Sequence, residues 1–234
     1  SSLGSVIDGG KVISAGNYLL SPNGNCKAVM QGDGNFVIYK SGKAIWCSAT
    51  NTSAFSSYFA TMQADGNFVI YGQNGTSKTA VWASGTNYGA VSGCKYQLRL
   101  NDSGRLDVIN TKNSNQLIWN NTSQISYHNN LNVGETMLSS NGKYRAQMQT
   151  DGNFVVYDVS TSTAKPIWNS RTHVSGKTIN TTKGSTVKMQ QDGNLVVVDS
   201  TNKVIWNSKT AVGAQSGYVY KLILTNEGKL QIRK

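Results

Sequence analysis

The chain has 234 residues, enough for one large domain or two ordinary ones, and it contains 24 glycines but only 2 prolines, a composition typical of short strands joined by tight turns. It has no apolar run near the roughly 18 residues of a membrane-spanning helix, so we expect no membrane insertion. The net charge of +11 comes from lysines and arginines scattered singly, and without a basic helix or a known module this argues against a nucleic-acid-binding protein.

One ten-residue pattern recurs along the chain. It reads MQGDGNFVIY at 30–39, MQADGNFVIY at 62–71, MQTDGNFVVY at 148–157 and MQQDGNLVVV at 189–198. Degenerate copies read LNDSGRLDVI at 100–109 and LTNEGKLQIR at 224–233. Taken in chain order, each of the first five copies, and not the last, is followed by a short stretch that contains a tryptophan. These tryptophans are Trp46, Trp82, Trp119, Trp168 and Trp206. We therefore expect two homologous domains of three units each, at residues 1–122 and 123–234.

Within each copy, hydrophobic and polar side chains alternate with a period of two, which predicts short antiparallel strands and an all-β fold. The side chains expected to face the core in the first copy are Met30, Phe36 and Ile38. Asp33-Gly34 is a turn signal, and a turn there folds the strand back so that Gln31 approaches Asn35.

The degenerate copies separate the residues that the fold requires from those that serve another purpose. They keep the core-facing positions and the turn glycine but lose five residues of the opposite face. The replacements are Asn101, Ser103, Arg105, Asp107 and Ile109 in one copy, and Thr225, Glu227, Lys229, Gln231 and Arg233 in the other. Because a strand folds without these five residues, their retention elsewhere predicts a binding site that is present three or four times.

The five retained residues are Gln, Asp, Asn, Val and Tyr, and their chemistry indicates the type of ligand. Carboxylate, amide and phenol groups accept from and donate to neutral hydroxyls, and the valine side chain can contact the C–H surface of a sugar ring. Nothing in the motif itself attracts a phosphate. Each hydrogen bond is worth about 0.5–1.5 kcal/mol, so a single shallow site binds a monosaccharide weakly.

The spacing Q-x-D-x-N-x-V-x-Y resembles the mannose-binding signature of the monocot bulb lectins, the snowdrop-lectin-like family. The resemblance spans essentially the whole chain, and three copies match the signature in full. The candidate carbohydrate-binding residues are Gln31, Asp33, Asn35, Val37 and Tyr39; Gln63, Asp65, Asn67, Val69 and Tyr71; Gln149, Asp151, Asn153, Val155 and Tyr157; and Gln190, Asp192, Asn194 and Val196. It implies two tandem type II β-prism domains, each with three four-stranded antiparallel sheets around a pseudo-threefold axis.

The resemblance also implies a role for each residue type. Asp and Asn hold the axial O2 of α-D-mannose, Gln reaches O3, Tyr reaches O4, and Val contacts the ring carbons. Val198 replaces Tyr in the fourth copy, so we expect a weaker or altered site there. Family members also exchange terminal strands between domains or subunits, and a similar exchange here is a hypothesis.

The cysteines depart from the family pattern. Plant members usually carry a cysteine at the position of Gly34, tied to a second cysteine before the next motif, so that disulfide is missing here. The three cysteines are Cys26, Cys47 and Cys94, and the sequence leaves their pairing open.

Nothing in the sequence indicates an enzyme, a metal site or a cofactor. His128 and His173 lie in no nucleophile or metal pattern and are interpreted as surface residues. Glycoside hydrolysis needs paired carboxylates, whereas each intact copy supplies a single aspartate. The tryptophans recur even beside a degenerate copy, so we expect them to fill the core.

Three functional interpretations remain. The first is a multivalent lectin that binds mannose-type glycans or glycoproteins on cell surfaces. The second is a lectin-like bacteriocin or defence toxin that uses the same sites to recognise the surface polysaccharide of a target cell. The third is a protein–protein module with vestigial sites, against which the three complete motifs argue. The sequence leaves open whether the chain forms a homodimer.

The resemblance suggests a secreted or cell-surface protein. The chain opens SSLGSVIDGG, with no initiator Met and no signal-peptide pattern, and this start is compatible with a removed secretion signal.

Overall fold

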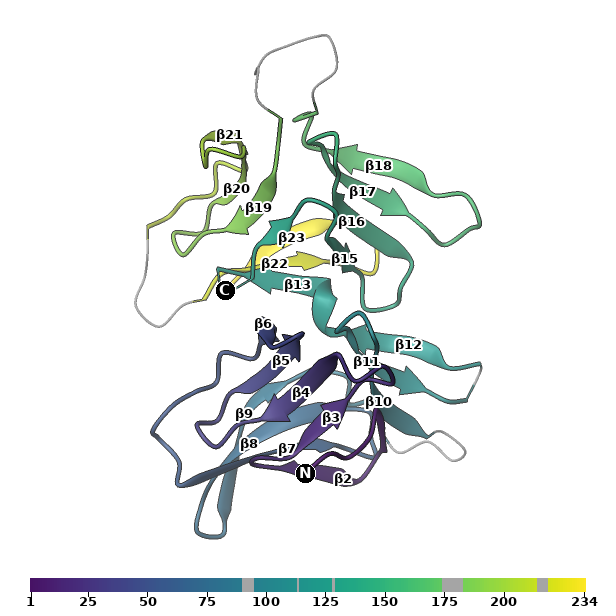
Figure 1. Ribbon diagram of the computed structural model, residues 1–234, viewed down its shortest axis with the longest axis vertical. Coiled ribbons are helices and arrows are strands. Elements are labelled where there is room, and N and C mark those ends of the chain that lie inside the picture. The colour runs from purple at the N-terminus through teal and green to yellow at the C-terminus, as the bar shows by residue number, and fades with distance from the viewer. Residues whose placement is uncertain (90–94, 113, 128, 174–182, 214–218) are drawn as a thin grey trace. The chain divides into compact units, whose positions relative to one another are not determined.

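The structure is a computed structural model that describes residues 1–89, 95–112, 114–127, 129–173, 183–213 and 219–234. The chain divides into two compact units, Ser1–Asn121 and Thr122–Lys234. Apart from one short 3-10 helix, η1 (Asn121–Ser123), every regular element in the described residues is a β-strand (Figure 1). The predicted all-β fold is confirmed.

Unit 1 consists of three four-stranded antiparallel sheets, and the first three strands of the chain each join a different sheet (Figure 1). Sheet 1 contains β3 (Tyr18–Leu20), β4 (Cys26–Met30), β5 (Phe36–Lys40) and β6 (Lys43–Cys47). Sheet 2 contains β2 (Lys11–Ser14), β7 (Ser57–Met62), β8 (Phe68–Asn74) and β9 (Ser77–Ala83). Sheet 3 contains β1 (Val6–Asp8), β10 (Tyr96–Leu100), β11 (Leu106–Asn110) and β12 (Gln116–Asn120).

Unit 2 repeats this arrangement with one difference. Sheet 4 contains β15 (Thr136–Leu138), β16 (Tyr144–Met148), β17 (Phe154–Asp158) and β18 (Lys165–Asn169). Sheet 5 contains β14 (Leu131–Asn132), β19 (Thr186–Met189), β20 (Leu195–Val198) and β21 (Val204–Asn207). Sheet 6 contains β13 (Gln124–Ser126), β22 (Lys221–Leu224) and β23 (Leu230–Arg233).

Two expectations are corrected by this topology. Sheet 6 has three strands in the described part of the chain, not four, because no strand pairs with the outer edge of β23. The described strands pair only within their own unit, so the hypothesis of strand exchange between the two domains of this chain is wrong for those residues.

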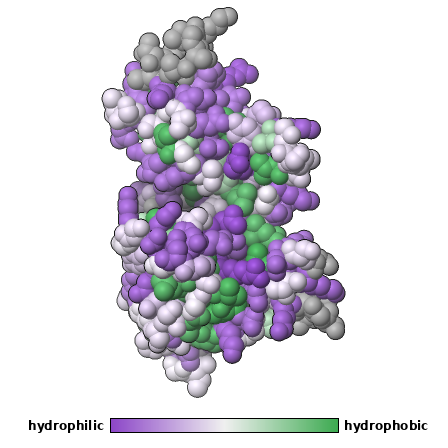
Figure 2. Space-filling model, turned by 45° about the vertical axis from the view of Figure 1, so that its right-hand side comes forward, coloured by the Kyte–Doolittle hydropathy of each residue, from purple (hydrophilic) through white to green (hydrophobic). Residues whose placement is uncertain are grey.

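Each unit has its own hydrophobic core, formed by the residues that the alternation predicted. Met30, Phe36 and Ile38 are fully buried, as are the equivalent residues of sheet 2. Leu230 and Ile232 of sheet 6 are only partly buried because β23 has a strand on one side only. Figure 2 shows polar side chains over most of the face in view, with apolar side chains in smaller groups.

The tryptophans pack differently in the two units. In unit 1 the ring of Trp82 lies edge-to-face with Trp46 and Trp119, at centroid distances of 6.0 and 5.5 Å. In unit 2 Trp168 meets Trp206 at 5.7 Å, and Trp168 remains 37% exposed. The prediction that tryptophans fill the core is therefore confirmed for Trp46 and Trp119 and wrong for Trp168.

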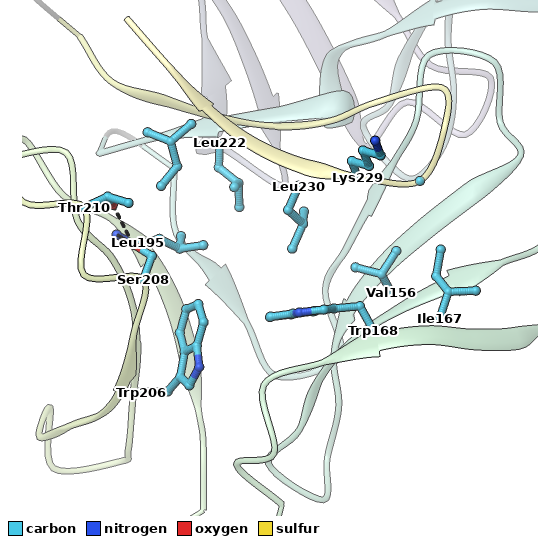
Figure 3. Close-up of a pocket in the computed structure, with 12 residues that line it drawn as sticks. Val156, Ile167, Trp168, Leu195, Trp206, Ser208, Thr210, Leu222, Lys229 and Leu230 are labelled. Carbon is cyan, nitrogen blue, oxygen red and sulfur yellow. Dashed lines mark hydrogen bonds between the residues drawn. The ribbon is translucent and has the colours of Figure 1, made fainter.

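A pocket of about 660 Å³ lies in unit 2 beside these rings (Figure 3). Trp168, Trp206, Leu230 and Ile232 are among the side chains that line it. The equivalent residues of unit 1 pack around Trp119 of β12, for which sheet 6 has no counterpart in the described residues. The pocket contains none of the predicted site residues and reflects the packing of the core.

Candidate functional site

Each copy of the motif forms the hairpin between the second and third strands of its sheet. We call these sites 1 (31–39, sheet 1), 2 (63–71, sheet 2), 3 (149–157, sheet 4) and 4 (190–198, sheet 5). In site 1 the backbone N–H of Gln31 donates to the carbonyl of Asn35 at 2.9 Å, and Gly34 N–H donates to Gln31 at 3.2 Å. The predicted turn at Asp33-Gly34 is confirmed, and it brings all five motif residues onto one hairpin.

The turn residue Gly34 accounts for one departure from the family pattern. Its φ is +94°, which disfavours any side chain. A Cβ at this position would lie 2.9 Å from the carbonyl oxygen of Thr50 and 2.7 Å from the ring of Tyr58. The position that holds a cysteine in plant members therefore has no room for one here.

Two of the three cysteines are free thiols in the structure. Cys26 is fully buried, and its thiol donates to the backbone carbonyl of Asp102 at 3.2 Å. It packs near the turn glycine Gly104 of sheet 3. Cys47 is half-buried and lies opposite Val37 in the β5–β6 pairing. Cys94 lies outside the described residues.

The motif aspartate is held in one orientation by the turn. In site 1 the backbone N–H of Asn35 donates to Asp33 Oδ1 at 2.9 Å, and the same bond in site 2 joins Asn67 to Asp65 at 3.0 Å. Sites 3 and 4 repeat it at 2.9 Å. Within the described residues the second oxygen of Asp33 accepts no hydrogen bond, so it is available to a ligand hydroxyl.

The glutamine and tyrosine of each complete site contact one another. Gln31 Nε2 donates to the hydroxyl of Tyr39 at 2.7 Å, and Gln63 donates to Tyr71 at the same distance. Gln149 and Tyr157 make the same contact in site 3. In site 4 the tyrosine position holds Val198, which is buried, so this contact is lost.

The residues that fix the motif asparagine were not predicted from the sequence. Ser48 and Thr50 lie two and four residues after Trp46, and their hydroxyl groups are hydrogen-bonded to each other at 2.6 Å. Thr50 Oγ1 donates to the carbonyl of Gly34 at 2.6 Å, so Ser48 Oγ is the donor in the bond between the two hydroxyls. Asn35 Oδ1 lies 3.2 Å from Ser48 Oγ and accepts from the Thr50 N–H at 3.4 Å. This leaves the amide nitrogen of Asn35 free among the described residues, to donate outward.

The same bonds recur in the other three sites, made by Ser84 and Thr86, Ser170 and Thr172, and Ser208 and Thr210. The signal was present in the sequence as W-x-S-x-T, which follows all four motifs. In sheet 3 Asn121 replaces the serine and accepts from Leu106 N–H at 2.8 Å.

The floor of each site is apolar. Val37, Val69, Val155 and Val196 are all at most 5% exposed. The predicted residues of each motif therefore form one group: valine at the base, with Asp and Asn at the turn and Gln and Tyr further along the strand. Among the described residues, the groups that remain free in sites 1 and 2 are an acceptor on Asp, a donor on Asn, an acceptor on Gln and a hydroxyl on Tyr. In site 3 one N–H of Asn153 donates to Asn169 Oδ1 at 3.3 Å.

The degenerate face of sheet 3 has the opposite character, because its polar groups satisfy one another. Arg105 donates to the two carboxylate oxygens of Asp107 at 2.7 and 3.0 Å. Asn101 donates to the same carboxylate at 2.8 Å, and Asp107 is only 4% exposed. This is the single ion pair in the described part of the chain, and it leaves no free carboxylate for a ligand.

The structure also bears on metal binding, membrane insertion and the two histidines. Across the described ranges, no group of three His, Cys, Asp or Glu side chains is placed to hold a metal ion. Nor does any helix among the described residues have the length and hydropathy to cross a membrane. His173 is exposed, and His128 lies outside the described residues.

Comparison with known proteins adds the family. The chain is 33% identical over 110 residues to the B-type lectin plumieribetin of Scorpaena plumieri, a match that covers 47% of this chain and 85% of that protein. It is 35% identical over 98 residues to a mannose-specific lectin of Aloe arborescens, covering 42% of this chain and 79% of that protein. The chain belongs to the bulb-type, or B-type, lectin family.

Among solved structures, the chain is similar to a two-domain fetuin-binding lectin of Scilla campanulata. The identity is 22%, the match covers 97% of this chain and 96% of that one, and the TM-score is 0.40. No protein-family model matches the chain.

Proposed function

We propose that this protein is a lectin that binds α-D-mannose-type glycans through sites 1 to 3, with site 4 as a weaker or altered site. The observation that supports this most directly is the contrast between the sheets. Among the described residues, sites 1 to 3 each present an aspartate oxygen, an asparagine N–H and a tyrosine hydroxyl over a buried valine, although Asn153 of site 3 also donates to Asn169 at 3.3 Å. The face of sheet 3, by contrast, closes on itself through Arg105 and Asp107.

The geometry suits a neutral polyol. The free Asp oxygen accepts from one ring hydroxyl while the Asn amide donates to it, and the Tyr hydroxyl serves another hydroxyl further along the strand. A ligand whose hydroxyl points elsewhere leaves these groups unpaired, which is how such a site discriminates between epimers. The mannose specificity named for the Aloe arborescens relative supports α-mannose as this ligand.

The sites act together on a glycosylated surface. A shallow site with a few hydrogen bonds binds a monosaccharide at about millimolar strength, roughly −4 kcal/mol. Several such sites engaged on one surface gain about 10²–10⁴ in avidity when the geometry permits simultaneous contact. This makes a dense glycan coat, rather than a free sugar, the ligand that the protein retains.

We also propose that the protein has no glycosidase activity. Each site supplies one carboxylate, whereas hydrolysis of a glycosidic bond requires an acid and a second carboxylate facing each other. A sugar-release assay on mannan tests this, and turnover that disappears in Asp33→Asn would contradict it.

A binding experiment on a mannan-coated surface tests the proposed function. The triple variant Asp33→Asn, Asp65→Asn, Asp151→Asn should lose nearly all retention. A control variant with the same change in charge, Asp8→Asn, Glu135→Gln, Glu227→Gln, should bind as the unmodified protein does, because these acids lie outside the four sites. Equal retention of both variants would contradict the proposal.

A further inference from the structure

Sites 2 and 3 each carry a cation beside the site tyrosine. In site 2 the ammonium of Lys78 lies 4.8 Å from the ring centroid of Tyr71, and in site 3 the guanidinium of Arg145 lies 5.3 Å from that of Tyr157. Contacts of this kind hold the cation against the aromatic face and leave its N–H groups free to donate.

Site 1 has a cation at the corresponding place. Lys27 lies directly opposite Tyr39 in the β4–β5 pairing, so the two side chains share one face of the sheet. Its ammonium lies 3.8 Å from the ring centroid of Tyr18, the aromatic residue on the adjoining strand β3. The side chain is exposed, and its strand position places it on the same face as the site tyrosine.

The three cations do not come from one inherited position. Lys27 and Arg145 occupy equivalent places, opposite the site tyrosine on the second strand of the sheet. In site 2 that place holds Phe59, whose ring stacks on Tyr71 at 5.2 Å and 24°. The cation comes instead from Lys78 on β9, the outer strand on the other side. Copying of one ancestral residue therefore does not explain the pattern.

These cations have no anionic partner in the protein. None of the three forms an ion pair within 4 Å in the described part of the chain. Near site 3, Asp158 follows Tyr157 in the sequence, but its carboxylate accepts from the N–H and hydroxyl of Ser160, at 2.9 and 2.6 Å. In sheet 3, by contrast, Arg105 is neutralised by Asp107.

The complete sites therefore combine a negative charge at the turn with a positive charge on the strand side. In site 2 the motif carboxylate Asp65 sits at the turn, and the ammonium of Lys78 lies over the ring of Tyr71. Asn67 and Tyr71 are four residues apart on an extended strand, a span of about 13 Å. An anion is repelled at one end of the site and attracted at the other, which favours one direction for a charged sugar.

We infer that sites 1 to 3 prefer mannosyl residues that carry an anionic substituent, a phosphate or a carboxylate, on the side of the ring that faces the tyrosine. This inference rests on the proposed mannose-binding function and names a subclass of its ligands. Lys27, Lys78 and Arg145 would select charged over neutral mannosyl residues, a selectivity that the motif residues alone do not provide.

Calorimetric titration distinguishes mannose binding itself from the preference for anionic mannosyl residues. The probes are methyl α-mannoside, its 6-phosphate, methyl α-mannosiduronate and inorganic phosphate, each in low and in high salt. We expect the phosphate ester to bind about 3- to 10-fold more tightly than the neutral glycoside at low salt, and this advantage to shrink in 0.5 M salt because ions screen the attraction. Tighter binding of the uronate would identify a carboxylate as the favoured group instead.

The triple variant Lys27→Gln, Lys78→Gln, Arg145→Gln should bind both sugars equally while keeping the affinity for the neutral one. The control Lys95→Gln, Lys112→Gln, Lys221→Gln removes the same charge from two residues that flank the strands of sheet 3 and one residue of sheet 6, and it should keep the preference. Equal affinity of the unmodified protein for charged and neutral sugars would overturn the inference and leave the lectin proposal standing. Inorganic phosphate binding as tightly as the ester, or a preference that survives in the triple variant, would also overturn it. Failure of every sugar to bind would overturn the proposed function as well.

Discussion

The side-chain amide of Gln63 donates to the hydroxyl of Tyr71 at 2.7 Å, and Gln31 and Tyr39 make the same bond at the same distance. The bond uses the hydroxyl as an acceptor, so the hydroxyl proton is left to point away from the protein. It also fixes a long glutamine side chain before any ligand arrives, which lowers the entropy lost on binding. Gln190 lacks this partner because Val198 stands at the tyrosine position.

Replacing Val198 by tyrosine should raise the affinity of site 4 for mannoside. In Val198→Tyr we expect site 4 to bind methyl α-mannoside about 2- to 10-fold more tightly, the gain of one hydrogen bond. The residue opposite Val198 is Thr186, which is smaller than the Lys27 that faces Tyr39. Titration calorimetry measures this as a change in affinity and in the number of resolved sites.

The control for this change is Val198→Phe, which adds the ring without the hydroxyl. It should leave the affinity of site 4 unchanged or lower it. Equal improvement by Phe and Tyr would show that ring contact, and not the hydrogen bond, accounts for the effect.

Removal of a motif aspartate should delete one site and leave the fold intact. Asp33→Ala, Asp65→Ala and Asp151→Ala should each lower the binding stoichiometry by one. Each also loses the bond from the asparagine N–H, at 2.9 to 3.0 Å, which costs about 1 kcal/mol of folding free energy. Unchanged stoichiometry in all three variants would refute the assignment of sites.

The hydroxyl pair behind the motif should matter for both stability and binding. Thr86 is 5% exposed, and its Oγ1 donates to the carbonyl of Gly66 at 2.6 Å. Thr86→Val keeps the shape but leaves that carbonyl unpaired, so we expect a loss of about 1–3 kcal/mol in the free energy of unfolding and weaker binding at site 2. Urea denaturation and calorimetry measure the two effects.

Thr79→Val on β9 is the matched control, because Thr79 is exposed and should change stability by no more than about 0.5 kcal/mol. If both valine variants unfold alike, Thr86 does not support the hairpin.

Much of this arrangement was predictable from the alternation of side chains. Met30, Phe36 and Ile38 were assigned to the core correctly because a period of two fixes which side chains share a face. The turn at Gly34 was predictable from a different local signal, the Asp33-Gly34 pair.

Long-range packing was not predictable in this way. The periodicity does not report that Trp168 stays partly exposed, because this depends on a strand that sheet 6 lacks in the described residues. The cation of site 2 was also missed, since Lys78 reaches Tyr71 from another strand.

The tryptophans allow a test of the difference between the two cores. Trp82→Ala removes a ring that packs edge-to-face on Trp46, Trp119 and Phe68, so we expect a loss of about 3–5 kcal/mol. Trp168→Ala removes a ring that is 37% exposed and should cost about half as much or less. Thermal unfolding followed by calorimetry compares them, and a larger loss from Trp168→Ala would contradict this description of the cores.

The proposed mannose binding is tested most directly by calorimetric titration of the whole chain with methyl α-mannoside, using methyl α-glucoside as the control sugar. We expect saturable, approximately millimolar binding of the mannoside at three or four sites per chain, with much weaker binding of the glucoside. No heat from the mannoside with a folded sample, or equal binding of the two sugars, would contradict the central claim that these hairpins are mannose sites.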